Sequence, residues 1–335
     1  MDDFVKYSFS SANSLPMKVL VQLDVLESIV LNKMVFPVHV QFNPTNKCTF
    51  TGKNACSFCS CKNRPKKAEF PKEELMHFVD TLKMLGCKSM TITGGGEPIL
   101  YPNLYSLLWC NRLASISSGL VTNGVLLDRV HPRAFDYFLT WIRISSSDEL
   151  GSHVDFEKWL ETVDKVSSQS KDVDWAFSHV LLTKPTDVPI RVLRLANKNK
   201  FTHVRFVNDL LKLDEIASIK FLERQIKSLK IDDKRVVYQG RKEYTHGSKK
   251  CYVSLLKPVV SAEGKLYPCC GTQYALKKPS LRYEPSMCMG NWTELPRLVY
   301  EQRFFDGSNC VRCYYDEYNK LIESLLVDYK HKRFV

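Results

Sequence analysis

Residues 48–61 read CTFTGKNACSFCSC, and residues 93–98 read TGGGEP. The first stretch places Cys48, Cys56 and Cys59 on one short loop. Three closely spaced thiolates can hold three irons of a [4Fe-4S] cluster and leave the fourth iron open. The glycine run offers backbone without side chains to a ligand that docks on that iron. Together, the two stretches indicate a metal centre with a bound ligand.

The cysteine loop has two other interpretations. A zinc ion completed by Cys61 would use the same thiols, or the thiols could be free structural groups. Four crowded thiolates are costly unless a metal neutralises them, which disfavours free thiols. Zinc is compatible with the cysteines taken alone. The glycine run favours the cluster over zinc, because zinc binding gives it no role.

Strand and helix patterns alternate around these two stretches. Strands are predicted over residues 36–42, 89–93, 119–122, 141–145, 175–183 and 202–207, and helices over 71–85, 104–113, 134–139 and 156–166. Such alternation is typical of parallel βα units, whose ligand sites gather at the carboxyl ends of the strands. The cysteine loop, the glycine run, residues 122–124 and residues 145–147 each follow a predicted strand. We therefore expect these four polar segments to meet at one edge of the sheet.

The composition is typical of a globular protein. The chain has 335 residues, of which 44% are hydrophobic and 25% charged, and no apolar run reaches the length of a membrane span. Charged residues interrupt the apolar part over residues 17–40, and no signal peptide precedes it. We expect a cytoplasmic protein with no membrane partner. Disulfides are rare in the cytoplasm, so the twelve cysteines favour metal or cluster ligation.

The chain is basic, with a formal net charge of +12 and a pI near 9.0. Residues 231–335 carry half of this excess in less than a third of the chain. A polyanionic substrate such as a nucleotide or nucleic acid is one interpretation. The alternative, which charge alone favours, is a solvated basic surface.

The two motifs and the strand order resemble those of radical S-adenosylmethionine (SAM) enzymes. Members of this superfamily carry a three-cysteine loop after the first strand, most often written C-x3-C-x2-C. They also have an aromatic residue before the last cysteine and a GGEP-type motif after the second strand. Here Phe58 precedes Cys59, and seven residues separate Cys48 from Cys56 where three are usual. The resemblance covers residues 35–210 and implies an α/β fold, a partial (β/α)6 TIM-like barrel.

The resemblance also implies cofactors. A [4Fe-4S] cluster on the three cysteines would bind the amino and carboxylate groups of SAM. Cleavage would then give methionine and a 5′-deoxyadenosyl radical, which abstracts a hydrogen atom from the substrate. A reductant such as flavodoxin or ferredoxin would supply the electron. The cofactor-binding residues implied in this way are Phe58, Gly94, Gly95, Gly96, Glu97, Asn123 and Ser145.

A second set of cysteines lies near the C-terminus. It resembles the twitch domain, the shortened relative of the SPASM domain, in which a β-hairpin and a following helix hold an auxiliary [4Fe-4S] cluster. The ligands implied are Cys251, Cys269, Cys310 and Cys313. Residues 259–268 read as the hairpin, with residues 262–264 as its turn. A structural zinc site is the alternative, and Cys270 and Cys288 are spare thiols or replacement ligands.

Several other polar residues have two interpretations each. Asn123 and Ser145 could equally be ordinary polar residues at strand ends. His179 could face a substrate, although a hydrogen-bonded core role is favoured for it. Arg205 and Asp209, near the last strand, invite the same caution. Cys87 and Cys110 are predicted to be core residues.

Four segments are predicted along the chain. They are an N-terminal helical extension (1–34), the radical SAM partial barrel (35–210), a linker helix over 211–229 with a basic loop (211–250) and the auxiliary-cluster domain (251–335). The substrate is predicted to be a nucleotide or nucleic-acid base, with a peptide or a small metabolite as the alternative. A zinc-stabilised nucleic-acid-binding module is the alternative from another class of protein.

Overall fold

The computed structural model of the chain describes residues 16–182, 186–209, 211–212, 220–228, 235–239, 246–272, 287–310, 313, 315–327 and 330. In these residues, one sheet has the strand order β10-β9-β8-β1-β2-β3-β4-β5-β6-β7. Its strands are β1 (His39–Phe42), β2 (Ser89–Ile92), β3 (Ser117–Thr122), β4 (Leu139–Ser147), β5 (Asp174–Leu181), β6 (His203–Asn208), β7 (Val236–Gln239), β8 (Val259–Val260), β9 (Lys265–Tyr267) and β10 (Gly290–Asn291).

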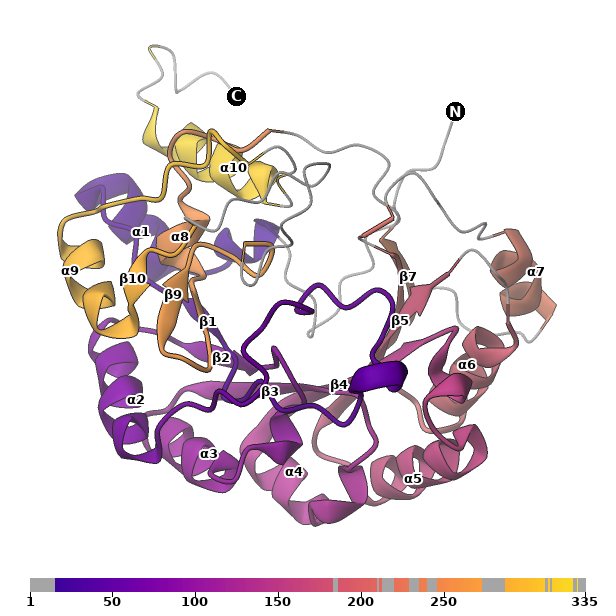
Figure 1. Cartoon of the computed structure of the whole chain (residues 1–335). Helices are drawn as coiled ribbons and strands as arrows, with labels where there is room; N and C mark the ends of the chain where they lie inside the picture. Colours follow the sequence, from indigo (N-terminus) through magenta and orange to yellow (C-terminus); the bar gives the residue numbers. More distant parts are fainter. Residues whose placement is uncertain are drawn as a thin grey trace.

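Helices follow one another around the outer side of the curved sheet, and the cysteine loop crosses its inner side (Figure 1). The helices are α1 (Leu23–Asn32), α2 (Leu75–Met84), α3 (Leu104–Leu113), α4 (Pro132–Phe138), α5 (Phe156–Gln169), α6 (Val188–Lys198), α7 (Lys220–Ser228), α8 (Val253–Leu256), α9 (Leu295–Tyr300) and α10 (Asp316–Leu326). Neighbouring strands from β1 to β7 are parallel. The predicted partial barrel is confirmed, and each strand predicted up to residue 207 is present.

The strands separate apolar residues from polar ones. Phe42 of β1 packs on Phe78 of α2, with ring centroids 4.9 Å apart, and Phe177 of β5 lies 6.1 Å from Trp159 of α5. Successive side chains of a strand point to opposite faces, so the alternate residues face the inside of the barrel. Those inward positions include the polar residues His39, Gln41, Thr91, Arg143, Ser145, Ser178, His203 and Arg205. The barrel is therefore apolar beneath its helices and polar inside.

The hairpin predicted over residues 259–268 is present and continues the barrel sheet. β8 and β9 are antiparallel, and Gly264 lies in their turn with a φ of 72°, which favours glycine. β8 also pairs in parallel with β1, on the side opposite β2. β10, which the sequence did not predict, extends the hairpin beyond β9.

The segments outside the barrel agree in part with the sequence analysis. Helix α1 lies in the predicted N-terminal extension and contacts α10, while residues 1–15 lie outside the described residues. Helix α7 falls within the predicted linker helix, of which residues 213–219 and 229 lie outside them too. The predicted linker also contains β7, a strand that the sequence analysis missed. No helix in the described part of the chain has the length and apolar character that crossing a membrane requires.

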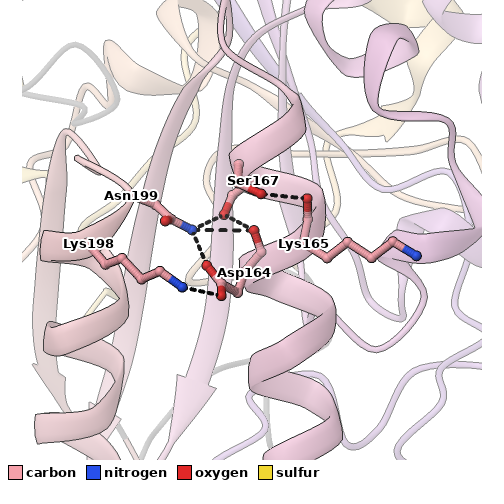
Figure 2. Close-up of polar contacts among 6 residues, drawn as sticks. Asp164, Lys165, Ser167, Lys198 and Asn199 are labelled. Carbon is pink, nitrogen blue, oxygen red and sulfur yellow. Dashed lines mark hydrogen bonds and ion pairs between the residues drawn. The ribbon is translucent and has the colours of Figure 1, made fainter.

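A polar cluster ties two of the outer helices together (Figure 2). The Asp164 carboxylate on α5 accepts from Nζ of Lys198 at 2.6 Å and from Nδ2 of Asn199 at 2.9 Å. Asn199 Nδ2 also donates to the Ser167 hydroxyl at 2.8 Å. The hydrogen bond from Lys198 is the main cause that holds the pKa of Asp164 below its usual value. This carboxylate therefore stabilises the fold in its ionised form.

We expect Asp164→Ala to lower the free energy of unfolding by about 1 kcal/mol at neutral pH, because two donors lose their acceptor. Since the folded-state pKa is depressed, the contribution is present above the ordinary aspartate pKa and is lost as pH falls through the folded-state value. Urea unfolding at several pH values would check this. Glu157→Gln, which breaks an exposed pair with Arg191, is the control, with a smaller expected loss because solvent screens an exposed ion pair. A loss for Asp164→Ala that does not change with pH would contradict the electrostatic explanation.

Candidate active site

A cavity of about 440 Å³ among the described residues opens at the carboxyl ends of β2, β3 and β4. Its lining includes all of the residues that the sequence analysis assigns to the SAM cluster and to SAM binding. They are Cys48, Cys56, Phe58, Cys59, Gly94, Gly95, Gly96, Glu97, Asn123 and Ser145. Cys61 lines the cavity as well. The four polar segments expected at one sheet edge do meet there.

Arg64 is buried beside the cysteine loop and connects its two ends. Its Nε donates to the carbonyl of Asn46 at 2.9 Å, and its Nη1 donates to the carbonyl of Cys61 at 2.8 Å. Nη1 also lies 3.6 Å from Sγ of Cys59. One guanidinium thus fixes both ends of the loop and places a positive charge next to a predicted cluster ligand. The sequence analysis missed this residue.

The thiols of the loop are hard to ionise on their own. Burial raises the pKa of Cys48, and it raises the pKa of Cys56 to about 12, with the nearby Cys59 thiol adding to the shift. Bound iron reverses this balance, because a coordinating thiol is deprotonated. Three cysteine donors that line one cavity fit a [4Fe-4S] cluster, which is held by cysteine thiolates.

Backbone atoms occupy the space next to the glycine run. A Cβ on Gly94 would lie 1.8 Å from the carbonyl oxygen of Gly96, and a Cβ on Gly96 would lie 1.9 Å from that of Lys47. The N–H of Gly96 donates to the carbonyl of Thr45 at 3.1 Å, and the N–H of Glu97 donates to that of Lys47 at 2.7 Å. The run therefore packs directly against the start of the cysteine loop. Only residues without side chains allow this approach.

Glu97 joins the glycine run to the end of β3. Its Oε1 accepts from the Thr122 hydroxyl at 2.7 Å and from the N–H of Ile99 at 3.2 Å, and its Oε2 accepts from the N–H of Asn123 at 2.8 Å. Burial raises the pKa of this carboxyl, while the same hydrogen bonds act in the opposite direction. Both oxygens thus bond to the chain itself, and a direct contact of Glu97 with SAM stays a prediction.

Asn123 connects β3 to the cysteine loop. Its Nδ2 donates to the Thr49 hydroxyl at 2.9 Å, and its Oδ1 accepts from the N–H of Val125 at 3.1 Å. Its carbonyl accepts from Nε1 of Trp159 at 2.9 Å. Ser145, at the end of β4, is half-buried and faces the cavity. For both residues, a contact with SAM stays a prediction.

The loop after β4 holds the cysteine loop from another side. Oε1 of Glu149 accepts from the N–H of Ser57 at 2.7 Å and lies 3.3 Å from Nε2 of His153. Cys56, Glu149 and His153 offer ligand atoms within 4.8 Å of one another. This trio, which the sequence analysis did not predict, is an alternative set of donors for a single metal ion.

A second cavity gathers the four cysteines that the sequence analysis assigns to an auxiliary cluster, namely Cys251, Cys269, Cys310 and Cys313. Cys251 forms an isolated antiparallel β-bridge with Phe305, and the carbonyl of Cys310 accepts from the N–H of Gly247 at 2.8 Å. Burial raises the pKa of Cys251 to about 12, and the thiols of Cys313 and Cys310 add to the shift. Four thiols from three chain segments around one cavity fit a metal centre, with one donor for each iron of a [4Fe-4S] cluster.

The remaining cysteines differ in their surroundings. Cys270 is exposed, with its Sγ 3.3 Å from the hydroxyl of Tyr315, and Cys288 lies outside the lining of the second cavity. Burial raises the pKa of Cys61 to about 12, and the Cys59 thiol adds to it. Cys87 is buried in the core, as predicted. The choice between Cys48 and Cys61 as cluster ligand stays open.

His179 is a hydrogen-bonded core residue, the interpretation that the sequence analysis favours. It is fully buried on the face of β5 that carries Phe177, and it is not among the residues that line the cavity. Its Nδ1 lies 3.0 Å from the Ser146 hydroxyl and its Nε2 lies 3.2 Å from Oδ1 of Asp148. Arg205 differs, because it lies on the inward face of the barrel.

The fold and the site together define a class of enzyme. A three-cysteine loop and a glycine run meet in one cavity, at the carboxyl ends of the strands of a partial barrel. Residues 42–196 match the family model described as the radical SAM superfamily. Residues 42–196 therefore form a domain of the radical SAM superfamily, whose members use a [4Fe-4S] cluster and SAM.

Solved structures share the fold. SuiB from Streptococcus suis, bound to the precursor peptide SuiA, has a TM-score of 0.59 at 14% identity, with 96% of this chain and 81% of that chain covered. A structure of anSMEcpe with bound AdoMet has a TM-score of 0.57 at 15% identity, with 89% and 86% covered. At these identities, the likeness shows the fold alone. No curated protein sequence matches the chain.

We expect Arg64→Met to shift the reduction potential of the SAM-cleaving cluster to a more negative value. The Arg64 guanidinium lies 3.6 Å from Sγ of Cys59, and a nearby positive charge stabilises the more negative, reduced cluster. A redox titration followed by electron paramagnetic resonance would measure the shift. Arg112→Met, on the outer helix α3, is the charge-matched control. Equal potentials in the two variants would exclude this role of Arg64.

Proposed function

We propose that Cys48, Cys56 and Cys59 bind the SAM-cleaving [4Fe-4S] cluster, and that the enzyme abstracts a hydrogen atom from a nucleotide or nucleic-acid base. The observation that carries the ligand assignment is the meeting of these thiols with the glycine run in one cavity. The net charge of +12 is compatible with a polyanionic substrate. The inward-facing Arg143 and Arg205 add to that support.

The residues of the chain bind and orient the cofactors. When bound, the cluster and SAM supply the 5′-deoxyadenosyl radical. Backbone carbonyls of the glycine run would accept hydrogen bonds from the SAM amino group, because no side chain shields them. Phe58 would pack near the adenine, and Ser145 would lie near the ribose or the methionine part. Asn123 and Glu97 keep the end of β3, the glycine run and the cysteine loop in one arrangement.

The four cysteines of the second cavity bind an auxiliary [4Fe-4S] cluster in this proposal, within a C-terminal unit of residues 251–335 that follows a 211–250 linker and a 35–210 barrel. Their gathering from three chain segments supports it. A flavodoxin or a ferredoxin supplies the electrons. All twelve cysteines are thiols, which suits the reducing cytoplasm as the place of action.

A peptide substrate is the second candidate. It is supported by two solved structures of the same fold, SuiB bound to its precursor peptide and anSMEcpe bound to a Cp18Cys peptide. The basic interior of the barrel favours the nucleotide, because arginine side chains bind phosphate oxygens in a bidentate way. A small metabolite that carries a phosphate would satisfy the same residues.

Anaerobic purification tests the proposed chemistry. We expect brown protein with about eight irons per chain, and reductive formation of 5′-deoxyadenosine and methionine from SAM. About four irons with the same cleavage would remove the auxiliary cluster from the proposal. Colourless protein that holds zinc and leaves SAM intact would support a zinc-stabilised nucleic-acid-binding module in its place.

The unusual spacing of the cysteine loop is tested by two single substitutions. We expect Cys48→Ala to abolish formation of 5′-deoxyadenosine and Cys61→Ala to retain it, because the first cysteine supplies a cluster ligand in the proposed assignment. Cleavage and the low-temperature resonance spectrum of the reduced cluster would be measured for both variants. If Cys48→Ala still forms 5′-deoxyadenosine and Cys61→Ala does not, Cys61 would replace Cys48 as the third cluster ligand.

A further inference from the structure

The turn of the C-terminal hairpin touches the start of the cysteine loop. Glu263 lies in the turn between β8 and β9, and its Oε2 accepts from Nδ2 of Asn46 at 3.3 Å. The two residues are 217 positions apart in the sequence. Asn46 comes two positions before Cys48, the first predicted ligand of the SAM-cleaving cluster. The contact therefore joins the C-terminal unit to the segment that carries this site.

Asn46 is a buried junction between the parts of the SAM site. Its Nδ2 also donates to the carbonyl of Pro65 at 3.1 Å, and its N–H donates to that of Ala68 at 2.9 Å. Its own carbonyl accepts from Nε of Arg64, the residue that fixes both ends of the cysteine loop. A Cβ on Gly96 would lie 2.6 Å from the carbonyl carbon of Asn46, so the glycine run packs on the same residue. A displacement of Asn46 would therefore reach the cysteine loop and the glycine run together.

The hairpin turn holds Glu263 in a defined position. The buried Ser261 hydroxyl accepts from the N–H of Glu263 at 3.3 Å and from that of Lys265 at 3.2 Å. The N–H of Gly264 donates to the Ser261 carbonyl at 2.9 Å, and the Gly264 carbonyl accepts from the N–H of Trp292 at 2.8 Å. A carboxylate on a turn that is already ordered loses less conformational freedom when it accepts a hydrogen bond.

We propose that Glu263 is a positioning residue for the SAM site, acting through Asn46 and Arg64 on the geometry of the cysteine loop. A hydrogen bond to an ionised acceptor is roughly twice as strong as one between neutral groups, so a carboxylate suits this task. β9 begins two residues after Glu263 and leads to Cys269, a predicted ligand of the auxiliary cluster. The C-terminal unit would thus help to build the SAM site in addition to its own. The inference rests on the proposed function, which assigns the cluster ligands that the loop presents.

The test compares wild type, Glu263→Ala and Glu263→Gln as anaerobically reconstituted full-length enzymes. In Glu263→Ala, we expect the amides of residues 46–64 to exchange with deuterium about tenfold faster, because the lost hydrogen bond makes local opening more frequent. The SAM dissociation constant should rise about tenfold, and the resonance spectrum of the reduced, SAM-bound cluster should change. Glu263→Gln keeps an acceptor oxygen and is expected to restore most of the wild-type behaviour. Exchange in α5 serves as the internal reference.

Glu74→Ala is the matched control. Oε2 of Glu74 accepts from Nε1 of Trp292 at 2.8 Å, so this carboxylate also joins the C-terminal unit to the barrel. Glu74 precedes α2 and is not among the residues that line the SAM cavity. We expect Glu74→Ala to lower the melting temperature while exchange over residues 46–64, SAM affinity and the resonance spectrum stay as in the wild type.

Three results would overturn the inference. They are wild-type exchange and SAM affinity in Glu263→Ala, the same changes in Glu74→Ala as in Glu263→Ala, and a Glu263→Gln enzyme as impaired as Glu263→Ala. The second would show that any loosening of the C-terminal unit suffices, and the third that the hydrogen bond is not the cause. Hydrogen exchange requires no SAM cleavage. A wild-type enzyme that fails to cleave SAM would therefore refute the proposed function alone, and exchange over residues 46–64 would still decide on Glu263.

Discussion

Replacement of Cys59 by alanine is expected to abolish SAM cleavage and to lower the iron content from about eight to about four per chain. Cys59 lines the cavity with Cys48 and Cys56, and its Sγ contacts the Arg64 guanidinium. Two thiolates leave two of the four irons without a protein ligand, so the whole cluster is expected to be lost, and the open iron to which SAM would bind is lost with it. Iron analysis, the visible absorption spectrum and chromatography of 5′-deoxyadenosine would measure the three consequences.

Cys110→Ala is the matched control, because Cys110 lies on α3 and outside the lining of both cavities. It is expected to keep both its iron and its SAM cleavage. Full cleavage in Cys59→Ala would show that another thiol, such as Cys61, completes the cluster. Loss of all iron in Cys59→Ala would show that the two centres are not assembled independently.

Gly96→Ala is expected to reduce SAM cleavage about a hundredfold, because a displacement of about 1 Å at a catalytic site has an effect of this size. The new Cβ would lie 1.9 Å from the carbonyl oxygen of Lys47, and backbone atoms cannot rotate away as a flexible side chain can. The hydrogen bonds from Gly96 to Thr45 and from Glu97 to Lys47 must then change. The start of the cysteine loop would move with them.

Gly151→Ala provides the control for this substitution. Its Cβ would lie 4.0 Å from Cβ of Phe156, an ordinary contact, so we expect normal cleavage. The SAM dissociation constant and the melting temperature, measured beside the cleavage rate, separate loss of binding from loss of the fold. Normal cleavage in Gly96→Ala would mean that the glycine run can move away from the cysteine loop without disturbing SAM.

The barrel and the grouping of each set of cysteines could be predicted because the sequence patterns that indicate them are local. Three thiols in a dozen residues, a glycine run after a strand and the alternation of strands with helices need no knowledge of distant contacts. The cysteines of the second cavity span more than sixty residues, but the first two lie at a recognisable spacing on either side of the hairpin turn at Gly264. Such patterns can be recognised from residues that are close together in the sequence.

The parts that the sequence did not reveal depend on how the chain returns on itself. Arg64 resembles any basic loop residue until its guanidinium is seen to join Asn46 to Cys61. Glu149 gains its role from contact with Ser57, which lies more than ninety positions away. The four-residue strand β7 stands next to basic and turn-forming residues, so its pattern is too short to recognise. The inward orientation of Arg143 and Arg205 follows from the strand register, which the whole sheet determines.

The pairing of β1 with β8 has a consequence for the synthesis of the protein on the ribosome. Amides along this edge of β1, at Val38, Gln41 and Asn43, donate to the carbonyls of Leu256, Pro258 and Val260. Those acceptors are translated roughly 220 residues after β1. A nascent chain therefore carries an open strand edge through most of its synthesis, and such an edge invites pairing with foreign strands. The last quarter of the chain supplies β8, which covers the open edge of β1. Premature termination of translation would therefore release a fragment whose exposed strand edge promotes aggregation.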